Sequence, residues 1–164
     1  MFTIESLIRC WHNETEICIA LADKMPPGGL DYRPTPGQRH TLDLMRYLTK
    51  GPYTGIVRVL AGDWSATPPT MELVKDMPPS DFAAMMRWQD AEVARLLRAA
   101  NPLDLEHGTM TFPFGETFTK IDAIVNYPYR WLTGYRMQLF LYLKAAGATG
   151  LSTPDLWRPP KPKG

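Results

Sequence analysis

Apolar residues recur at helical spacing in four long stretches of the chain. In the first stretch, residues 2–25, an apolar or small residue occurs every three or four positions, the pattern of an amphipathic helix. Prolines and glycines separate the stretches and mark where helices must end. The pattern therefore predicts an all-α four-helix bundle over residues 1–150 and a proline-rich tail over residues 151–164. The predicted helices are residues 2–25, 40–62, 80–100 and 119–146.

Several local signals set the details of this bundle. Gly51-Pro52 interrupts the second helix, which either kinks there or consists of two shorter helices. Pro128 kinks the last helix or separates it from a preceding turn. Ser80 is a favourable N-cap for the third helix. Residues 65–79 form a long loop, in which we expect a helical turn at residues 71–75.

The segment from residue 106 to residue 118 differs from the rest of the chain. It is rich in threonine and phenylalanine, which favour extended structure, and Gly115 offers a turn. We expect a short β-hairpin or an extended crossover here. The tail after residue 150 is either a surface strap or a disordered end, because prolines make up much of it.

Composition and net charge exclude some functional classes of protein. The chain has 164 residues, a formal net charge of +1 and only three histidines. A general nucleic-acid-binding protein would carry a basic excess, so that class is disfavoured. We also expect no membrane span, because no apolar run reaches the ~20 residues that a span requires. Cys10 and Cys18 lie too far apart on one helix to pair, and free thiols favour a cytoplasmic location.

One row of aromatic residues is the clearest candidate for a binding site. Tyr127, Trp131 and Tyr135 follow one another at a spacing of four, so they share one face of the last helix. They form either an aromatic core stripe or the wall of a ligand pocket. Arg130 and Arg136 flank the row, and we expect both to reach solvent. Phosphate loops, Cys-x-x-Cys pairs, His-Glu-x-x-His motifs and nucleophile elbows are absent from the sequence.

Two longer stretches carry a resemblance to a known family. The first is KMPPGGLDYRPTPGQRHTLDLMRYL, residues 24–48, and the second is WLTGYRMQLFLYLKAAG, residues 131–147. Together with FPFGETFTKIDAI, residues 112–124, and TPDLW in the tail, they resemble the DinB/YfiT-like superfamily of helical bundle proteins. The resemblance implies a DinB-like four-helix bundle with a long crossover, and a homodimer formed through bundle faces.

The resemblance also implies a metal site, from which this chain departs. Members often hold a divalent metal with three histidines, at positions that correspond here to Tyr47, Trp131 and Tyr135. The indole of tryptophan only donates hydrogen bonds, and a tyrosine ligates a divalent metal only after losing a proton whose pKa is near 10. We therefore expect no metal and no cofactor. We predict a ligand pocket at these three residues, with Tyr127, Gln138 and His12 as neighbours.

These observations lead to one main functional hypothesis and one alternative. The main hypothesis is a DinB-like bundle without catalytic metal that binds a small apolar ligand or a protein partner. The alternative is a divergent enzyme of the family's metal-dependent hydrolase or thiol S-transferase type. Such an enzyme would use tyrosine as acid or base, or a substitute metal site built from His12, His40 and carboxylates such as Asp43 or Asp122. Because the family's metal ligands are lost, we favour the hypothesis that this protein is not an enzyme.

Overall fold

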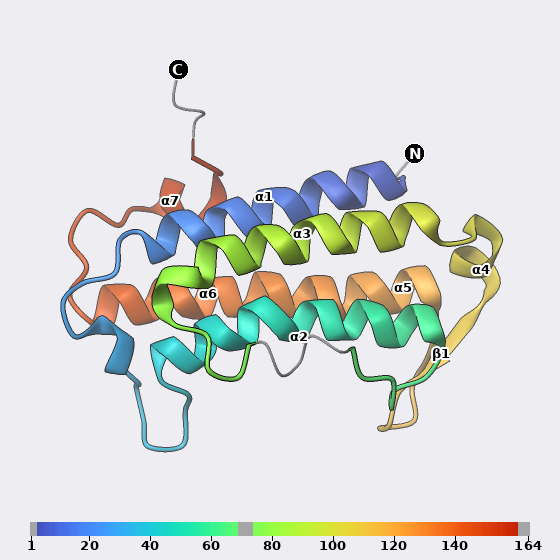
Figure 1. Cartoon of the computed structure of the whole chain (residues 1–164), viewed down its shortest axis with the longest axis horizontal. Coiled ribbons are helices and arrows are strands. Elements are labelled where there is room, and N and C mark those ends of the chain that lie inside the picture. The colour runs from blue at the N-terminus through green and yellow to red at the C-terminus, as the bar shows by residue number, and fades with distance from the viewer. Residues whose placement is uncertain (1–2, 69–73, 161–164) are drawn as a thin grey trace.

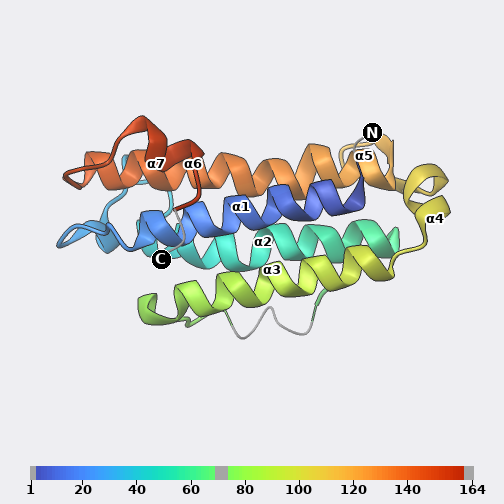
Figure 2. The ribbon, with the colours of Figure 1, turned by 90° about the horizontal axis from the view of Figure 1, so that it is seen from above.

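Four long helices form the body of the protein in the computed structural model, which describes residues 3–68 and 74–160. α1 and α6 run in one direction along the bundle, and α2 and α3 run in the other (Figure 1). α1 packs against α3 and α6, and α2 packs against the same two helices, so α1 and α2 occupy opposite corners (Figure 2). The predicted all-α four-helix bundle is confirmed. The long helices are α1 (Ile4–Ala22), α2 (Thr41–Ala61), α3 (Phe82–Ala99) and α6 (Arg130–Ala145).

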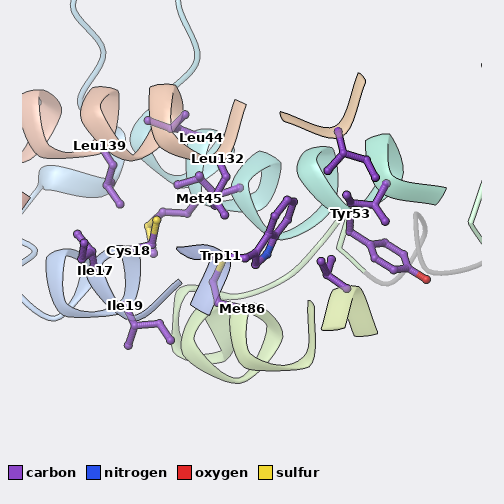
Figure 3. Close-up of a cluster of buried hydrophobic side chains, with 14 of the residues drawn as sticks. Trp11, Ile17, Cys18, Ile19, Leu44, Met45, Tyr53, Met86, Leu132 and Leu139 are labelled. Carbon is purple, nitrogen blue, oxygen red and sulfur yellow. The ribbon is translucent and has the colours of Figure 1, made fainter. Parts of the chain in front are cut away.

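Apolar side chains from all four helices meet along the bundle axis. Trp11, Leu44, Met86 and Leu132 have essentially no exposed surface, and each comes from a different long helix (Figure 3). Burying these side chains is the main force that holds the helices together. Cys18 is buried in the same core, and both cysteines are free, as the sequence predicts. None of the described helices is both long and apolar enough to cross a membrane.

α2 continues without a break through Gly51-Pro52, so the second helix does not consist of two shorter ones. A proline lacks the amide hydrogen that would bond to the carbonyl four residues earlier, here that of Leu48. Gln89 on α3 replaces this donor: its amide nitrogen lies 3.0 Å from the Leu48 oxygen. The side-chain oxygen of Gln89 also accepts the Tyr53 amide at 3.1 Å. This buried glutamine stabilises the helix where the proline would otherwise disrupt it.

The predicted long loop lies between α2 and α3, which run in the same direction, so the chain returns along the bundle between them. It begins at Gly62, which ends α2 in the left-handed conformation, and reaches the 3-10 turn η3 (Pro79–Asp81). The helical turn expected at residues 71–75 falls mostly outside the described residues. The prediction that Ser80 caps α3 is wrong. The prolines before it favour the 3-10 turn, so α3 begins one residue after Asp81, and the Ser80 hydroxyl bonds to the Asp81 carboxylate.

Short elements close the two ends of the bundle. The expected hairpin is present: β1 and β2 pair antiparallel, with Met110 opposite Phe118. The extended structure expected from residue 106 begins later, because His107 still ends the short helix before the hairpin. The tail forms α7, which packs against α1 and α6 and buries Leu156, so residues up to 160 form a surface strap. The short elements are η1 (Gly29–Asp31), α4 (Pro102–His107), β1 (Thr109–Thr111), β2 (Thr117–Thr119), α5 (Lys120–Ile124), the π-helix η4 (Val125–Tyr129) and α7 (Thr153–Trp157).

Candidate ligand site on the α2 and α6 face

Tyr47 and Tyr135 meet between α2 and α6. Their ring centroids are 4.8 Å apart in an edge-to-face arrangement, the geometry that aromatic pairs prefer. The guanidinium of Arg39, just before α2 begins, lies over the Tyr47 ring at 4.4 Å and within 5.8 Å of the Tyr135 ring. Two of the three positions singled out by the sequence are therefore in direct contact, and an arginine covers them.

Two glycines on α2 make room for the aromatic rings. A Cβ atom on Gly51 would lie 2.6 Å from the Tyr47 ring. A Cβ atom on Gly55, one turn further, would lie 2.8 Å from Pro128 and 3.1 Å from the Trp131 ring. Such distances are shorter than van der Waals contact allows, so only glycine lets α2 and the rings approach this closely. The rings of Tyr47 and Trp131 occupy the space along this face of α2.

Trp131 and Tyr127 continue the aromatic row towards the hairpin. The Trp131 ring lies 6.0 Å from Trp64, and the Tyr127 ring lies 6.2 Å from Trp131. Tyr127 packs against Phe112 at 3.9 Å, and its hydroxyl donates to Glu116 at 2.6 Å. This hydrogen bond ties the row to the turn of the hairpin. At this end the row is partly buried and packs against the hydrophobic core.

Burial raises the pKa of the Tyr47 hydroxyl above its ordinary value. The neighbouring Tyr135 raises it further, whereas Arg39 acts in the opposite direction. Tyr47 therefore keeps its proton at neutral pH. A protonated phenol donates a hydrogen bond and is a poor ligand for a divalent metal. The pKa of Tyr127 is also raised, chiefly by its hydrogen bond to Glu116.

Beside the tyrosine pair, a hollow of about 480 Å³ lies between the segment before α2 and the outer side of α6. Its surface is mostly apolar, and Leu141 in its wall is 54% exposed. Gln138 donates to the Tyr142 hydroxyl at 2.6 Å, and Tyr142 packs edge-on against Tyr32. The wall is thus braced by specific contacts. It consists of Tyr32, Pro34, Gln38, Gly134, Met137, Gln138, Leu141, Tyr142 and Ala145.

His12 does not join this site. It is exposed on α1, where its Nδ1 lies 2.7 Å from a carboxylate oxygen of Asp90 on α3. The α1/α3 contact is on the opposite side of the bundle from the α2/α6 contact. His12 is therefore not a neighbour of Tyr47, and no pattern in the sequence indicates its pairing with Asp90.

The substitute metal ligands are also dispersed. His40 bonds through Nδ1 to the Asp31 carbonyl at 2.7 Å, and Asp43 pairs with Arg46. Asp122 accepts a hydrogen bond from the Thr119 hydroxyl. Within residues 3–68 and 74–160, no three His, Cys, Asp or Glu side chains gather as a metal site would require.

Two arginines depart from what the sequence suggested. Arg136 was expected to reach solvent, but it is 3% exposed and pairs with Glu14 on α1, so that prediction is wrong. Its guanidinium also donates to the Leu156 carbonyl in α7. Arg130 is exposed, as expected. Arg39 was not singled out, because its contact with Tyr47 depends on the path of the loop before α2.

Comparison with solved structures identifies the fold. A crystal structure of a DinB-like protein (YjoA) from Bacillus subtilis superposes on this chain with a TM-score of 0.67. The match covers 90% of this chain and 96% of that protein, at 12% sequence identity. This chain has the DinB-like fold. No protein-family model matches the sequence, and no curated protein matches it.

Proposed function

We propose that this DinB-like bundle works without a catalytic metal and binds a small apolar ligand in the hollow between residues 32–38 and α6. The observation that carries the proposal is the contact between Tyr47 and Tyr135. In the family that the sequence resembles, these positions hold metal-binding histidines. Here they hold two tyrosines, whose rings pack on each other, and the Tyr47 ring also packs against Gly51.

The adjoining hollow supports the ligand part of the proposal. Ligand sites are concave and mostly apolar, with a few polar groups that fix orientation. Gln38 and Gln138 supply such groups, while Tyr32, Met137 and Leu141 supply apolar surface. Gly134 has nothing within contact distance of its Cβ position, so this part of the wall is open.

The structure does not favour tyrosine as a general base. A base must lose its proton near the working pH, but burial and Tyr135 raise the pKa of Tyr47. A Tyr47 phenol can donate a hydrogen bond to a bound molecule. We therefore assign it a binding role.

The metal part of the proposal is tested by restoring the histidines. We expect the purified protein to carry no stoichiometric Zn²⁺ or Ni²⁺ after incubation with either ion, as measured by mass spectrometry. The triple variant Tyr47→His, Trp131→His, Tyr135→His should gain about one ion per chain, because Tyr47 contacts Tyr135 and Trp131 lies one turn before Tyr135 on α6, against Gly55 of α2. Circular dichroism checks that the variant is folded. A stoichiometric metal in the unaltered protein would contradict the proposal.

The ligand part is tested by methyl NMR on protein labelled at the methionine methyl groups. Met137 lies in the wall of the hollow, whereas Met110 is buried under the hairpin. Titration with small apolar fragments should shift the Met137 signal and leave the Met110 signal in place. Gly134→Trp, which fills the open part of the wall, should abolish the shift. If no fragment moves the Met137 signal at millimolar concentration, the ligand proposal is wrong.

A further inference from the structure

Arg39 has an unusual environment for an arginine. Its side chain is exposed, and its guanidinium stacks on the Tyr47 ring. Among the residues that the structure describes, no carboxylate lies within ion-pairing distance of it. The other arginine of the same loop, Arg33, differs because it donates to the Pro36 carbonyl at 3.1 Å.

Stacking uses only the face of the guanidinium plane. The N–H donors point outwards within that plane, and their fork matches the two oxygens of a carboxylate. Contact with Tyr47 and Tyr135 restricts the positions that the guanidinium adopts. Holding the donors in place reduces the entropy that would be lost when an anion binds.

The position of Arg39 connects these donors to the hollow. Gln38, its neighbour in the chain, lines the hollow. Gly134 and Gln138, which flank Tyr135 on α6, line it as well. Arg39 itself does not line the hollow, but it follows Gln38 directly, and its guanidinium lies 5.8 Å from the ring of Tyr135, the residue after Gly134.

We propose that the ligand of this site is a small organic monocarboxylate with an apolar body. The carboxylate binds the N–H fork of Arg39, and the apolar body lies against Tyr32, Met137 and Leu141. One unpaired arginine matches a single negative charge better than the nearly two charges of a phosphate monoester. This inference rests on the function proposed above, and it adds the chemical class of the ligand.

Three matched probes test the inference by isothermal calorimetry: 4-phenylbutyrate, the neutral 4-phenyl-1-butanol and 4-phenylbutyl phosphate. We expect the carboxylate to bind about tenfold more tightly than the alcohol, because charge-assisted hydrogen bonds stabilise it. Arg39→Gln should remove this preference and leave the affinity for the alcohol unchanged. Arg33→Gln, which removes the same charge from the same loop, should leave the preference intact.

Each other outcome has a definite meaning. If carboxylate and alcohol bind equally and Arg39→Gln has no effect, the carboxylate class is wrong while the apolar site stands. An equal loss in Arg33→Gln would show that general charge, and not the Arg39 fork, sets the preference. Tighter binding of the phosphate would overturn the choice of a monocarboxylate. If none of the three probes binds, both this inference and the proposed function fail.

Discussion

Two arginines, Arg136 on α6 and Arg39 in the segment before α2, stack on aromatic rings, and their surroundings give them different roles. The Arg136 guanidinium lies 5.0 Å from the Trp157 ring, and the Arg39 guanidinium lies 4.4 Å from the Tyr47 ring. Arg136 is buried, and it bonds to a carboxylate of α1 and a carbonyl of α7. Arg39 is exposed at the end of the α2/α6 contact and stacks without an ion pair among the described residues.

The comparison shows that stacking alone does not define an arginine's function. A buried guanidinium is tolerated only when its donors are satisfied, so Arg136 must serve the fold. It links three helices, α1, α6 and α7, through these two bonds. An exposed guanidinium needs no protein partner because water satisfies its donors, and Arg39 is therefore free to meet a ligand. Substitutions at the two arginines should separate these roles.

The largest effect is expected for Arg136→Met. This change leaves the Glu14 carboxylate, only 13% exposed, without its partner. Breaking a buried ion pair from one side costs about 3–5 kcal/mol of unfolding free energy. The double variant Glu14→Gln, Arg136→Met should recover much of that loss, because no charge remains buried. Urea unfolding followed by circular dichroism measures both, and a loss below about 1 kcal/mol in the single variant would contradict a structural role.

The same pair predicts a dependence of stability on pH. Burial raises the pKa of the Glu14 carboxyl in the folded protein, although Arg136 opposes this. The folded state therefore binds this proton more tightly than the unfolded chain. The contribution of Glu14 to stability falls as the pH rises from the ordinary glutamate pKa, about 4.3, through the raised pKa.

The difference in unfolding free energy between the unaltered protein and Glu14→Gln isolates this effect. The unaltered protein should lose stability relative to the variant as the pH rises through that window. Other carboxyls act in the opposite sense: hydrogen bonds from Lys24 and Ser152 lower the pKa of Asp155, so its contribution is lost as the pH falls. Both proteins share these groups, and a flat difference would show that Glu14 titrates normally.

Much of the fold was predictable from the sequence because helices and hairpins follow local rules. The spacing of apolar residues gave the four long helices, and threonine and phenylalanine with Gly115 gave the hairpin. The continuation of α2 as one helix through Pro52 could not be predicted in this way. It depends on Gln89, which is 37 residues away in sequence and meets α2 only after the bundle forms.

The candidate site was predictable only in part, for the same reason. The contact between Tyr47 and Tyr135 follows from the resemblance to a bundle in which these positions converge. The burial of Arg136 required a glutamate from α1 and a carbonyl from α7, neither of which periodicity along α6 reveals. His12 was predicted to be a neighbour of the site. Whether it lies there depends on which corner of the bundle each helix occupies, and the spacing of residues along one helix does not reveal this.

A smaller effect is expected where α2 approaches the aromatic row. Alanine at Gly55 would force Pro128 and Trp131 to move, and such overpacking costs about 1–3 kcal/mol. The gain of about 1 kcal/mol from the better helix propensity of alanine offsets part of it. Gly134→Ala is the matched control, because its Cβ would meet nothing within 4 Å and only the propensity gain remains. Thermal unfolding should show Gly55→Ala destabilised and Gly134→Ala slightly stabilised; equal shifts would contradict the close packing at Gly55.

The smallest effect is expected for the stability of Arg39→Gln. An exposed stacking contact between a cation and an aromatic ring contributes only about 0.5–1 kcal/mol. The variant should therefore unfold at nearly the same urea concentration as the unaltered protein, in contrast to Arg136→Met. A loss comparable to that of Arg136→Met would mean that Arg39 is part of the structural framework. Near-normal stability combined with a lost preference for 4-phenylbutyrate would instead assign its donors to a ligand, because the fold would be shown not to need them.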